Sequence, residues 1–417
     1  MGSRNTQGPN HSRRLGPGFL LVLAYPALKL LTRILGRKDA APIPGDATSG
    51  PTRDSLIVYQ DYQVGDLFMA MPAIRLLARH MQVTILCRPD CLFLFRDLAL
   101  PAVGFHNPFF ARASAGTLRT ALRNAWALRG DGRIRGEALD LDADPRSAFF
   151  LKVAGAGRTH AYARQFSWLF DATFPLPPSF PADSKMHQAD KNLAVAKAFL
   201  RMRGLLPSGT PAAAGTREGT LGGTVTGLER FPVPESEPER SAVKRDPRNL
   251  VLSCWTRKDE KNWSLENWDR VAGFLWERGM RAQILVPPDG DAEFHRFRVR
   301  WQDRLEFLTG DLEAVFRRVR ASAGVICTDN FLGHMGAYLG KPVFWINGSS
   351  DPEHVVPKGQ MMGSNTGVKT RIVQFEPMPC RPCGHRCVNP VYKQCLLELR
   401  PETVLAQLED WLAHELK

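Results

Sequence analysis

Residues 324–350 constrain the fold most, because strand and helix patterns alternate there over a short length of chain. The small and β-branched run 324–327 predicts a buried strand, and 343–346 predicts a second one. Between them, the polar residues 328–330 are types that cap helix starts, and 331–339 has a helical period. Such a loop directs backbone N–H groups and the positive end of a helix dipole at one point, which suits a phosphate or diphosphate.

The same alternation begins near the start of the chain. Residues 55–59 predict a strand, 67–80 an amphipathic helix and 82–87 a second strand, which together form a parallel strand–helix–strand unit. Pro72 inside the helical pattern predicts a kink or a late helix start. Three further elements complete this half: a strand with an acidic end within 136–144 and helices over 145–156 and 187–204.

A second run of alternation starts at Asn249 and predicts another doubly wound α/β sheet. One of its helices carries Trp268 and Trp276, which we place together on the buried face. The last amphipathic segment, 402–416, is expected to pack across the boundary between the two sheets. The predicted elements are strands 249–254, 281–286 and 305–310 and helices 265–279, 291–301 and 312–321.

Between the two halves, residues 206–246 are rich in Gly, Pro, Thr and Glu and show no sustained period, which predicts a linker. Ligands of doubly wound sheets bind at the carboxyl ends of the strands, so we expect a cleft between two such sheets. The expected division is an N-terminal segment and linker over 1–50, a first α/β domain over 51–205, a flexible linker over 206–247, a second α/β domain over 248–400 and a C-terminal helix over 401–417.

The composition favours an anionic partner, because 55 Lys and Arg stand against 42 Asp and Glu, a net charge of +13. Anionic lipid or a phosphorylated substrate fits better than nucleic acid, since no RNA- or DNA-binding motif is recognisable. Eight cysteines in 417 residues do not make a disulfide scaffold, and two of the four scattered ones fall in predicted strands, as reduced core thiols do. We therefore expect a cytoplasmic protein.

The N-terminal segment predicts a membrane-surface helix. The apolar run 19–25 is shorter than the about 20 apolar residues that span a bilayer, and Pro26 interrupts it. Positive charge follows it where a signal peptide would have a small-residue cleavage site. Residues 27–38 are amphipathic and basic, which is typical of a helix lying on an anionic leaflet. A helix packed on the main body, or an uncleaved signal anchor, is the alternative.

Two loops carry residues suited to acid–base and anion chemistry. Asp66, before the helix of the first unit, is either a helix cap or a general base that takes a proton from an attacking hydroxyl. Thr256, Arg257 and Lys261, between a strand and a helix, fit diphosphate binding. The alternative is a solvated basic loop, because two acidic residues at 259–260 offset part of the charge.

Two more loops are ambiguous by themselves. Asp329 and Asn330 either cap a helix or belong to a site, and His334 is either a packed histidine or a functional one. Arg146 follows the acidic loop 140–142. It either binds an anionic group of a second substrate or is a surface arginine.

The cysteines near the C-terminus form a separate motif. Cys380, Cys383, Cys387 and Cys395 begin with a CxxC pair, and two more cysteines follow within about fifteen residues, which is plausible spacing for structural zinc. The spacing is tighter than in a usual zinc ribbon. Reduced thiols or a redox pair are the alternatives, and a catalytic zinc is not expected here.

Taken together, the loops resemble glycosyltransferase family 9, which contains the bacterial lipopolysaccharide heptosyltransferases. The resemblance rests on VGDLFMAMPAIRLL, ALDLDADPRSAFF, TRKDEKNW, TDNFLGHMGAYLGKPVFWINGSSDP and the Cys-rich CRPCGHRC run, in that order from Ser55 to the C-terminus. It implies a GT-B fold of two Rossmann-like domains, the first binding the acceptor and the second the nucleotide-sugar. It also implies a metal-independent, inverting transfer of a sugar, often heptose, from a nucleotide diphosphate to a membrane-anchored lipopolysaccharide of the cell envelope.

The resemblance also assigns roles to residues. The catalytic base is Asp66, and the acceptor side holds Gly65 and Arg146. The donor side holds Thr256, Arg257, Lys261, Asp329, Asn330, Leu332, Gly333 and His334. It places the protein on the cytoplasmic face of the bacterial inner membrane, with an anionic glycolipid and a nucleotide-sugar as its partners and no nucleic acid.

The chain departs from the family pattern at one place. The family usually has Asp-Thr-Gly where this chain has Asp329, Asn330 and Phe331, which replaces a flexible glycine beside the donor with a bulky residue. Asn330 is a residue type that tolerates the left-handed conformation. This departure motivates an alternative function, a catalytically silent, membrane-associated binding protein of the same fold. A zinc-dependent nucleic-acid module, motivated by the cysteines and the charge, is a third hypothesis.

Overall fold

The computed structural model describes residues 55–60, 63–111, 114–163, 167–175, 187–207, 246–287, 292–357, 370–383 and 386–416. The predicted membrane-surface helix and most of the predicted linker lie outside these ranges. Within them, the helices are all too short or too polar to cross a membrane.

The first sheet has six parallel strands in the order β3-β2-β1-β4-β5-β6. Its helix α2 packs against α7, and α5 packs against α6. Residues 56–60 of β1 are all buried, as expected of a central strand covered on both faces. The strands are β1 (Ser55–Gln60), β2 (Gln82–Cys87), β3 (Ala102–Gly104), β4 (Glu137–Asp140), β5 (Arg158–Tyr162) and β6 (Ala172–Phe174), and the helices named here are α2 (Val64–His80), α5 (Ala115–Gly130), α6 (Pro145–Ala154) and α7 (Gln188–Met202).

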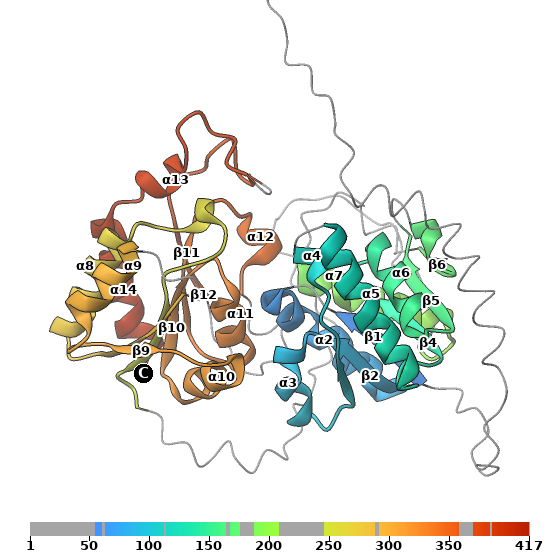
Figure 1. Ribbon diagram of the computed structural model, residues 1–417. Helices are drawn as coiled ribbons and strands as arrows, with labels where there is room; N and C mark the ends of the chain where they lie inside the picture. The colour runs from blue at the N-terminus through green and yellow to red at the C-terminus, as the bar shows by residue number, and fades with distance from the viewer. Residues whose placement is uncertain are drawn as a thin grey trace, which may run out of the picture.

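The second sheet also has six parallel strands, in the order β12-β11-β10-β7-β8-β9. Its strands are β7 (Asn249–Ser253), β8 (Arg281–Leu285), β9 (Glu306–Leu308), β10 (Gly324–Thr328), β11 (Val343–Asn347) and β12 (Thr370–Gln374). Its helices include α8 (Leu265–Glu277), α9 (Ala292–Trp301), α10 (Leu312–Ala321), α11 (Phe331–Tyr338) and α14 (Pro401–Glu415). The prediction of two doubly wound sheets is confirmed, and Figure 1 shows them as two lobes.

Both sheets have the same topology. In each, the first strand lies beside the fourth, and the chain winds outward from that pair in both directions. The first pair is β1 with β4 and the second is β7 with β10. Such a reversal point opens a crevice at the carboxyl ends of the two strands, where ligands of these folds bind.

Helix α2 begins earlier than predicted. Its N-cap is Gln63, which is extended, and the Gln63 backbone N–H donates to Asp66 Oδ2 at 3.3 Å. Asp66 is therefore a residue of the first turn and not the cap, and the late start predicted from Pro72 is wrong. The helix runs through Pro72, which is buried.

Two packing predictions are wrong. Trp276 is 46% exposed, because the helical period places it at the edge of the stripe that Trp268 and Leu275 bury. Helix α14 does not bridge the domains but packs on α8 and β12 of its own domain, where Trp411 contacts Phe344 with ring centroids 5.6 Å apart.

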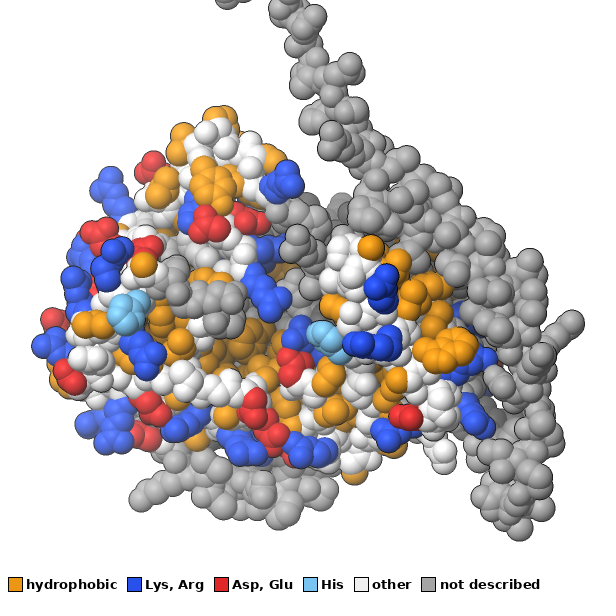
Figure 2. Space-filling model, viewed as in Figure 1, with side chains coloured by type: hydrophobic (Ala, Val, Ile, Leu, Met, Phe, Trp, Pro, Cys, Tyr) orange, Lys and Arg blue, Asp and Glu red, His pale blue; other side chains and the backbone are white. Residues whose placement is uncertain are grey.

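The two lobes meet mainly along α2 and α11 (Figure 1). Tyr338 of α11 contacts Phe68 of α2 at a centroid distance of 5.2 Å and accepts a hydrogen bond from Arg75 at 2.9 Å. Nearby, Arg96 of α3 (Phe93–Arg96) pairs with Glu313 of α10 at 2.5 Å. Figure 2 shows acidic and basic side chains side by side along the lower edge of the molecule. The lobes are therefore joined by direct contacts between helices.

Candidate active site

Four loops lie at the carboxyl ends of the two central strand pairs. Asp66 follows β1 and Asp142 follows β4 in the first sheet. Lys261 follows β7, and Asp329 follows β10 in the second. The reversal point of each sheet thus carries predicted site residues, as the general rule for such folds requires.

The two reversal points meet across the domain boundary at Gly65 and His334. A Cβ atom at Gly65 would lie 3.0 Å from Cδ2 of the His334 ring, which is tighter than nine in ten real Cβ contacts. The first turns of α2 and α11 therefore approach each other because position 65 has no side chain. Glycine at position 65 is therefore explained by packing against His334. The predicted role of Gly65 in binding the acceptor stays a prediction.

His334 is buried at this contact, with 5% of its surface exposed. Burial lowers the pKa of His334 to about 4, which the charge of Asp329 only partly opposes. His334 is therefore neutral at physiological pH. Within the described part of the chain its Nδ1 atom has no hydrogen-bond partner.

Asp66 has the properties of a general base. Burial and then the charge of Asp142 raise the pKa of Asp66 to about 7, against the Gln63 N–H and the two lysines Lys261 and Lys258. A carboxylate with a pKa near neutral accepts a proton well and is still substantially ionised at pH 7. The two lysines belong to the other domain, so the field at Asp66 is set by both domains.

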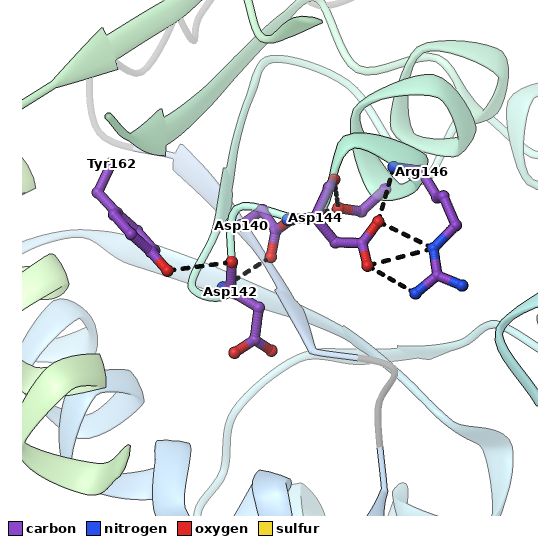
Figure 3. A network of polar contacts seen from close by, with 6 residues as sticks. Asp140, Asp142, Asp144, Arg146 and Tyr162 are labelled. Carbon is purple, nitrogen blue, oxygen red and sulfur yellow. Dashed lines mark hydrogen bonds and ion pairs between the residues drawn. The ribbon is translucent and has the colours of Figure 1, made fainter. Parts of the chain in front are cut away.

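The loop after β4 is fixed by a buried carboxylate. Asp140 accepts hydrogen bonds from the backbone N–H groups of Asp142 and Asp144, both at 2.9 Å, and from the Ser147 hydroxyl. The Tyr162 hydroxyl donates to the backbone carbonyl of Asp142 at 3.3 Å. Figure 3 shows the Asp142 carboxylate pointing away from Asp140. The loop therefore holds Asp142 in a set direction.

Arg146 is bound to a neighbour in its own loop. Its Nε and Nη2 atoms donate to the two carboxylate oxygens of Asp144 at 2.7 to 3.2 Å (Figure 3). The charge of Arg146 is therefore largely offset before any substrate binds. Its predicted contact with an anionic acceptor stays a prediction.

In the second domain, Lys261 and Asp329 form an ion pair with Nζ and Oδ2 2.5 Å apart. The Ser350 hydroxyl donates to the same carboxylate, and Asp329 is 6% exposed. Asp329 therefore orients the Lys261 ammonium, whose remaining protons are available to a ligand.

Thr256 and Arg257 are the other predicted donor residues of the loop that carries Lys261. The Thr256 backbone exchanges hydrogen bonds with the Asn262 amide at 2.7 and 2.9 Å, and the Thr256 hydroxyl accepts from the Lys258 N–H at 2.9 Å. Thr256 thus shapes the loop. Arg257 is exposed on the same loop.

The Asn330 and Phe331 departure does not distort the loop. Asn330 is extended, with φ −144°, and caps α11 by accepting from the Leu332 N–H at 3.0 Å. Its amide also donates to Ser253 Oγ at 2.7 Å and to a carbonyl at residue 255 at 3.1 Å. The left-handed conformation considered for Asn330 is therefore wrong, and Phe331 simply begins the helix.

The backbone donors predicted at the start of α11 are partly occupied. The Leu332 N–H is bound to Asn330, and the Gly333 backbone hydrogen-bonds the sulfur of Cys327. A Cβ at Gly333 would lie 3.1 Å from that sulfur, so glycine permits this close packing. Direct contact of Leu332, Gly333 and His334 with a donor stays a prediction.

The eight cysteines are all free thiols. Burial, and then the nearby Cys380 and Cys387, raise the pKa of Cys383 to about 11. Among the described residues, no group of three or more His, Cys, Asp or Glu side chains is arranged to hold a metal ion. Structural zinc on Cys380, Cys383, Cys387 and Cys395 stays a prediction.

Some residues of the site had no assigned role in the sequence. Asp142 was noted only as part of an acidic loop, although the strand order places it beside Asp66. Gln188, whose amide donates to Asp142 Oδ1 at 3.4 Å, and Ser350 were not recognised. The alternation of Asp140 and Asp142 after a buried strand was the one available signal.

Two doubly wound domains whose reversal points face each other define the GT-B fold. A family model described as Glycosyltransferase family 9 (heptosyltransferase) matches residues 136–383, more than half of the chain. The chain therefore belongs to glycosyltransferase family 9.

Solved structures share this fold. Escherichia coli heptosyltransferase WaaC with ADP matches with a TM-score of 0.57 and 15% identity, over 85% of this chain and 99% of that chain. The E. coli ADP-heptose lipopolysaccharide heptosyltransferase II matches with 0.57 and 17%, over 87% and 99%. A family 9 glycosyl transferase from Veillonella parvula matches with 0.58 and 13%, over 87% and 97%. The comparison with curated proteins gives no match.

Proposed function

We propose that this protein is an inverting glycosyltransferase that moves a sugar, most simply heptose, from a nucleotide-diphosphate donor to a lipopolysaccharide core or related envelope glycolipid. The observation that carries the proposal is that Asp66, with a pKa raised to about 7, lies within the electrostatic influence of Lys261 in the other domain, where Lys261 is paired with Asp329. A displacement with an anionic leaving group needs a base and a cation in one site. The heptosyltransferase family supports the sugar, and the solved structures of E. coli WaaC with ADP and with ADP-2-deoxy-2-fluoro heptose support the donor class.

The reaction is a single displacement. The acceptor hydroxyl oxygen attacks the anomeric carbon, its proton passes to Asp66, and the bond from that carbon to the donor diphosphate breaks. Attack on the face opposite the leaving group inverts the anomeric centre. The products are the glycoside and a free nucleoside diphosphate.

The leaving diphosphate is held by the loop of residues 256–262. Lys261 is oriented by Asp329, and Lys258 and Arg257 add positive charge on the same loop. Cations placed where charge develops stabilise the transition state without rearrangement. The proposed step uses no metal ion, because these side chains supply the positive charge that the leaving diphosphate requires.

The acceptor is proposed to bind at the first domain, with Gly65 and Arg146 at its edge. A glycolipid acceptor requires the enzyme at a membrane surface, and we propose that residues 1–50 provide this contact on the cytoplasmic face of the inner membrane. The basic and amphipathic pattern of residues 27–38 and the net charge of +13 support this location.

The alternative is a catalytically silent binding protein, motivated by the altered loop 329–331. The backbone at Phe331, the first residue of α11, does not require glycine, which favours the enzyme. A thermal-shift screen with ADP, GDP, UDP and CDP separates the two hypotheses. We expect stabilisation by at least one of them together with transfer activity.

The proposal is tested by mass analysis of the envelope glycolipid from cells with and without the gene. We expect the deletion to shorten the core by the mass of one sugar, and re-expression of the wild-type chain to restore it. A core of unchanged mass in the deletion would reject the proposed transfer.

A further inference from the structure

The proposed function leaves one motif unused, the Cys-rich segment, defined here as residues 378–383 and 386–399. Its helix α13 (Gln394–Leu397) lies at the end of the second lobe that also carries α12 (Pro352–Val355) (Figure 1). This is the end to which the carboxyl ends of β10 and β11 lead. The segment is therefore placed next to the loops of the donor side.

The first contact of the segment is with Asp259. The Tyr392 hydroxyl donates to Asp259 Oδ2 at 2.9 Å, and Lys393 Nζ lies 3.1 Å from Oδ1. Asp259 begins the short helical turn Asp259–Lys261, so the segment binds one end of a turn whose other end carries Lys261. A shift of that turn would move the Lys261 ammonium.

The second contact is with the loop after β11. A Cβ at Gly348 would lie 2.9 Å from Cδ1 of Leu396, which is buried beneath it. The Cys383 N–H donates to the Ser349 carbonyl at 3.0 Å. The next residue is Ser350, whose hydroxyl donates to Asp329. The segment thus supports the partner of Lys261 as well.

A third contact fixes the far side of the donor loop. The indole Nε1 of Trp263 donates to the Leu399 carbonyl at 3.1 Å, and the Trp263 side chain is buried. Trp263 follows the loop of residues 256–262. The Cys-rich segment therefore contacts the chain on both flanks of the Lys261–Asp329 pair.

We propose that the Cys-rich segment is a positioning element of the donor site, which holds the loops of Lys261 and Asp329 in register so that they form a ready site for the donor diphosphate. The inference rests on the proposed function, in that it assigns Lys261 to the donor. Tyr392, Lys393 and Leu396 are positioning residues, and they act through Asp259 and Gly348 without touching the donor.

The test is isothermal titration of the full-length protein with inorganic pyrophosphate, which probes the diphosphate site independently of base and sugar. The Tyr392→Phe/Lys393→Met variant is expected to bind pyrophosphate up to about tenfold more weakly, since two bonds to the exposed Asp259 carboxylate are lost. In transfer assays its KM for the donor should rise by a similar factor, while its KM for the acceptor stays unchanged. The control is Val388→Thr, a change at an exposed side chain of the same segment, with wild-type binding expected.

A rescue experiment tests the second contact. Gly348→Ala places a methyl group against Leu396 and is expected to weaken pyrophosphate binding about tenfold. In the Leu396→Ala background, where the contacting atoms are absent, the same Gly348→Ala change should have less than about a twofold effect. Circular dichroism and thermal unfolding establish that each variant is folded.

The outcomes separate the inference from the function beneath it. Folded Tyr392→Phe/Lys393→Met protein that binds pyrophosphate as wild type does, or a donor KM that moves together with the acceptor KM, would overturn the positioning role alone. Wild-type protein that binds neither pyrophosphate nor any nucleoside diphosphate would overturn the donor site itself and the inference with it.

Discussion

The two halves of this molecule have the same sheet topology but opposite chemistry at corresponding positions. In the first half, the loops at the reversal point carry Asp66, Asp140 and Asp142, and the nearby Arg146 is already bound to Asp144. In the second half, the loop of residues 256–262 carries one arginine and two lysines beside Asp259 and Glu260, and Asp259 is bound to Tyr392 and Lys393. The shared sheet topology determines where a site can form, and the charged residues of the four loops determine the chemistry of each domain's part of it.

Under the proposed function, this difference gives the two halves different parts of one reaction. The acidic half raises the pKa of Asp66 by burial and by the charge of Asp142, which prepares a proton acceptor. The basic half holds an ammonium group by its pair with Asp329, which prepares a site for a leaving anion. Substitutions in each half test this division, and they are taken in order of decreasing expected effect.

The largest effect is expected for Asp66→Asn. The amide keeps the shape of the side chain but does not accept the acceptor's proton, so transfer should fall by about 10²–10⁴-fold. The rate of glycoside formation under saturating donor and acceptor measures it. The control is Asp303→Asn, an exposed aspartate on the surface of the second domain. A variant with full transfer activity would remove the base from the acidic half.

The next effect is expected for Lys261→Met. Loss of the ammonium group at the leaving diphosphate should lower the transfer rate by about 10²-fold, as for other transition-state charge contacts. It also leaves Asp329 buried without its cation, so the variant should unfold at lower temperature.

Two companion variants separate these effects of Lys261→Met. Lys261→Arg, which keeps the charge, should retain more activity than Lys261→Met. The Lys261→Met/Asp329→Asn variant should regain thermal stability but not transfer. Recovery of transfer in that double variant would show that Lys261 acts only on the fold.

A smaller effect is expected for Gly65→Ala, which tests whether the two halves meet as described. The added methyl group would lie 3.0 Å from the His334 ring and should destabilise the protein by about 1–3 kcal/mol through overpacking. Chemical denaturation measures the loss. The His334→Ala background should remove most of it, and an undiminished loss there would place the strain elsewhere.

The smallest effect is a shift in pH dependence for Asp142→Asn. In wild type, kcat/KM should rise with pH through about 7 and then level off, because Asp66 must be ionised to act as a base. Removing the Asp142 charge favours ionised Asp66 and lowers its pKa, so the rise should move to lower pH. The Asp131→Asn variant, at the far end of α5, serves as the control. A profile that moves to higher pH would contradict the role of Asp142.

The sequence predicted the fold well where periodicity was long. The helix 312–321 and the strand 82–87 were predicted with the observed limits, because tertiary packing there agrees with local pattern. The three-residue strands β3 and β6 were not predicted, since so few residues carry no period. Helix α14 was assigned to the wrong neighbours, because an apolar stripe shows that a face is buried but not against which domain.

The sequence named candidate residues for the site but could not predict their charge states or contacts. The order of motifs pointed to Asp66, Lys261 and Asp329, yet the pKa of Asp66 depends on Asp142, which strand order alone brings near it. The pairing of Arg146 with Asp144 and the capping role of Asn330 are side-chain geometries that residue types do not determine. The sequence pattern identifies candidate site residues, and their neighbours in the structure determine their charge state and hydrogen bonding.

The division of labour is tested most directly by titrating two folded variants, Asp66→Asn and Lys261→Met, with inorganic pyrophosphate under identical conditions. The acidic half should have no part in binding the leaving group. Asp66→Asn is therefore predicted to bind pyrophosphate at least as tightly as wild type, whereas Lys261→Met binds it at least about tenfold more weakly. Equal weakening in both variants, or weakening in Asp66→Asn alone, would contradict the assignment of base and anion site to opposite halves.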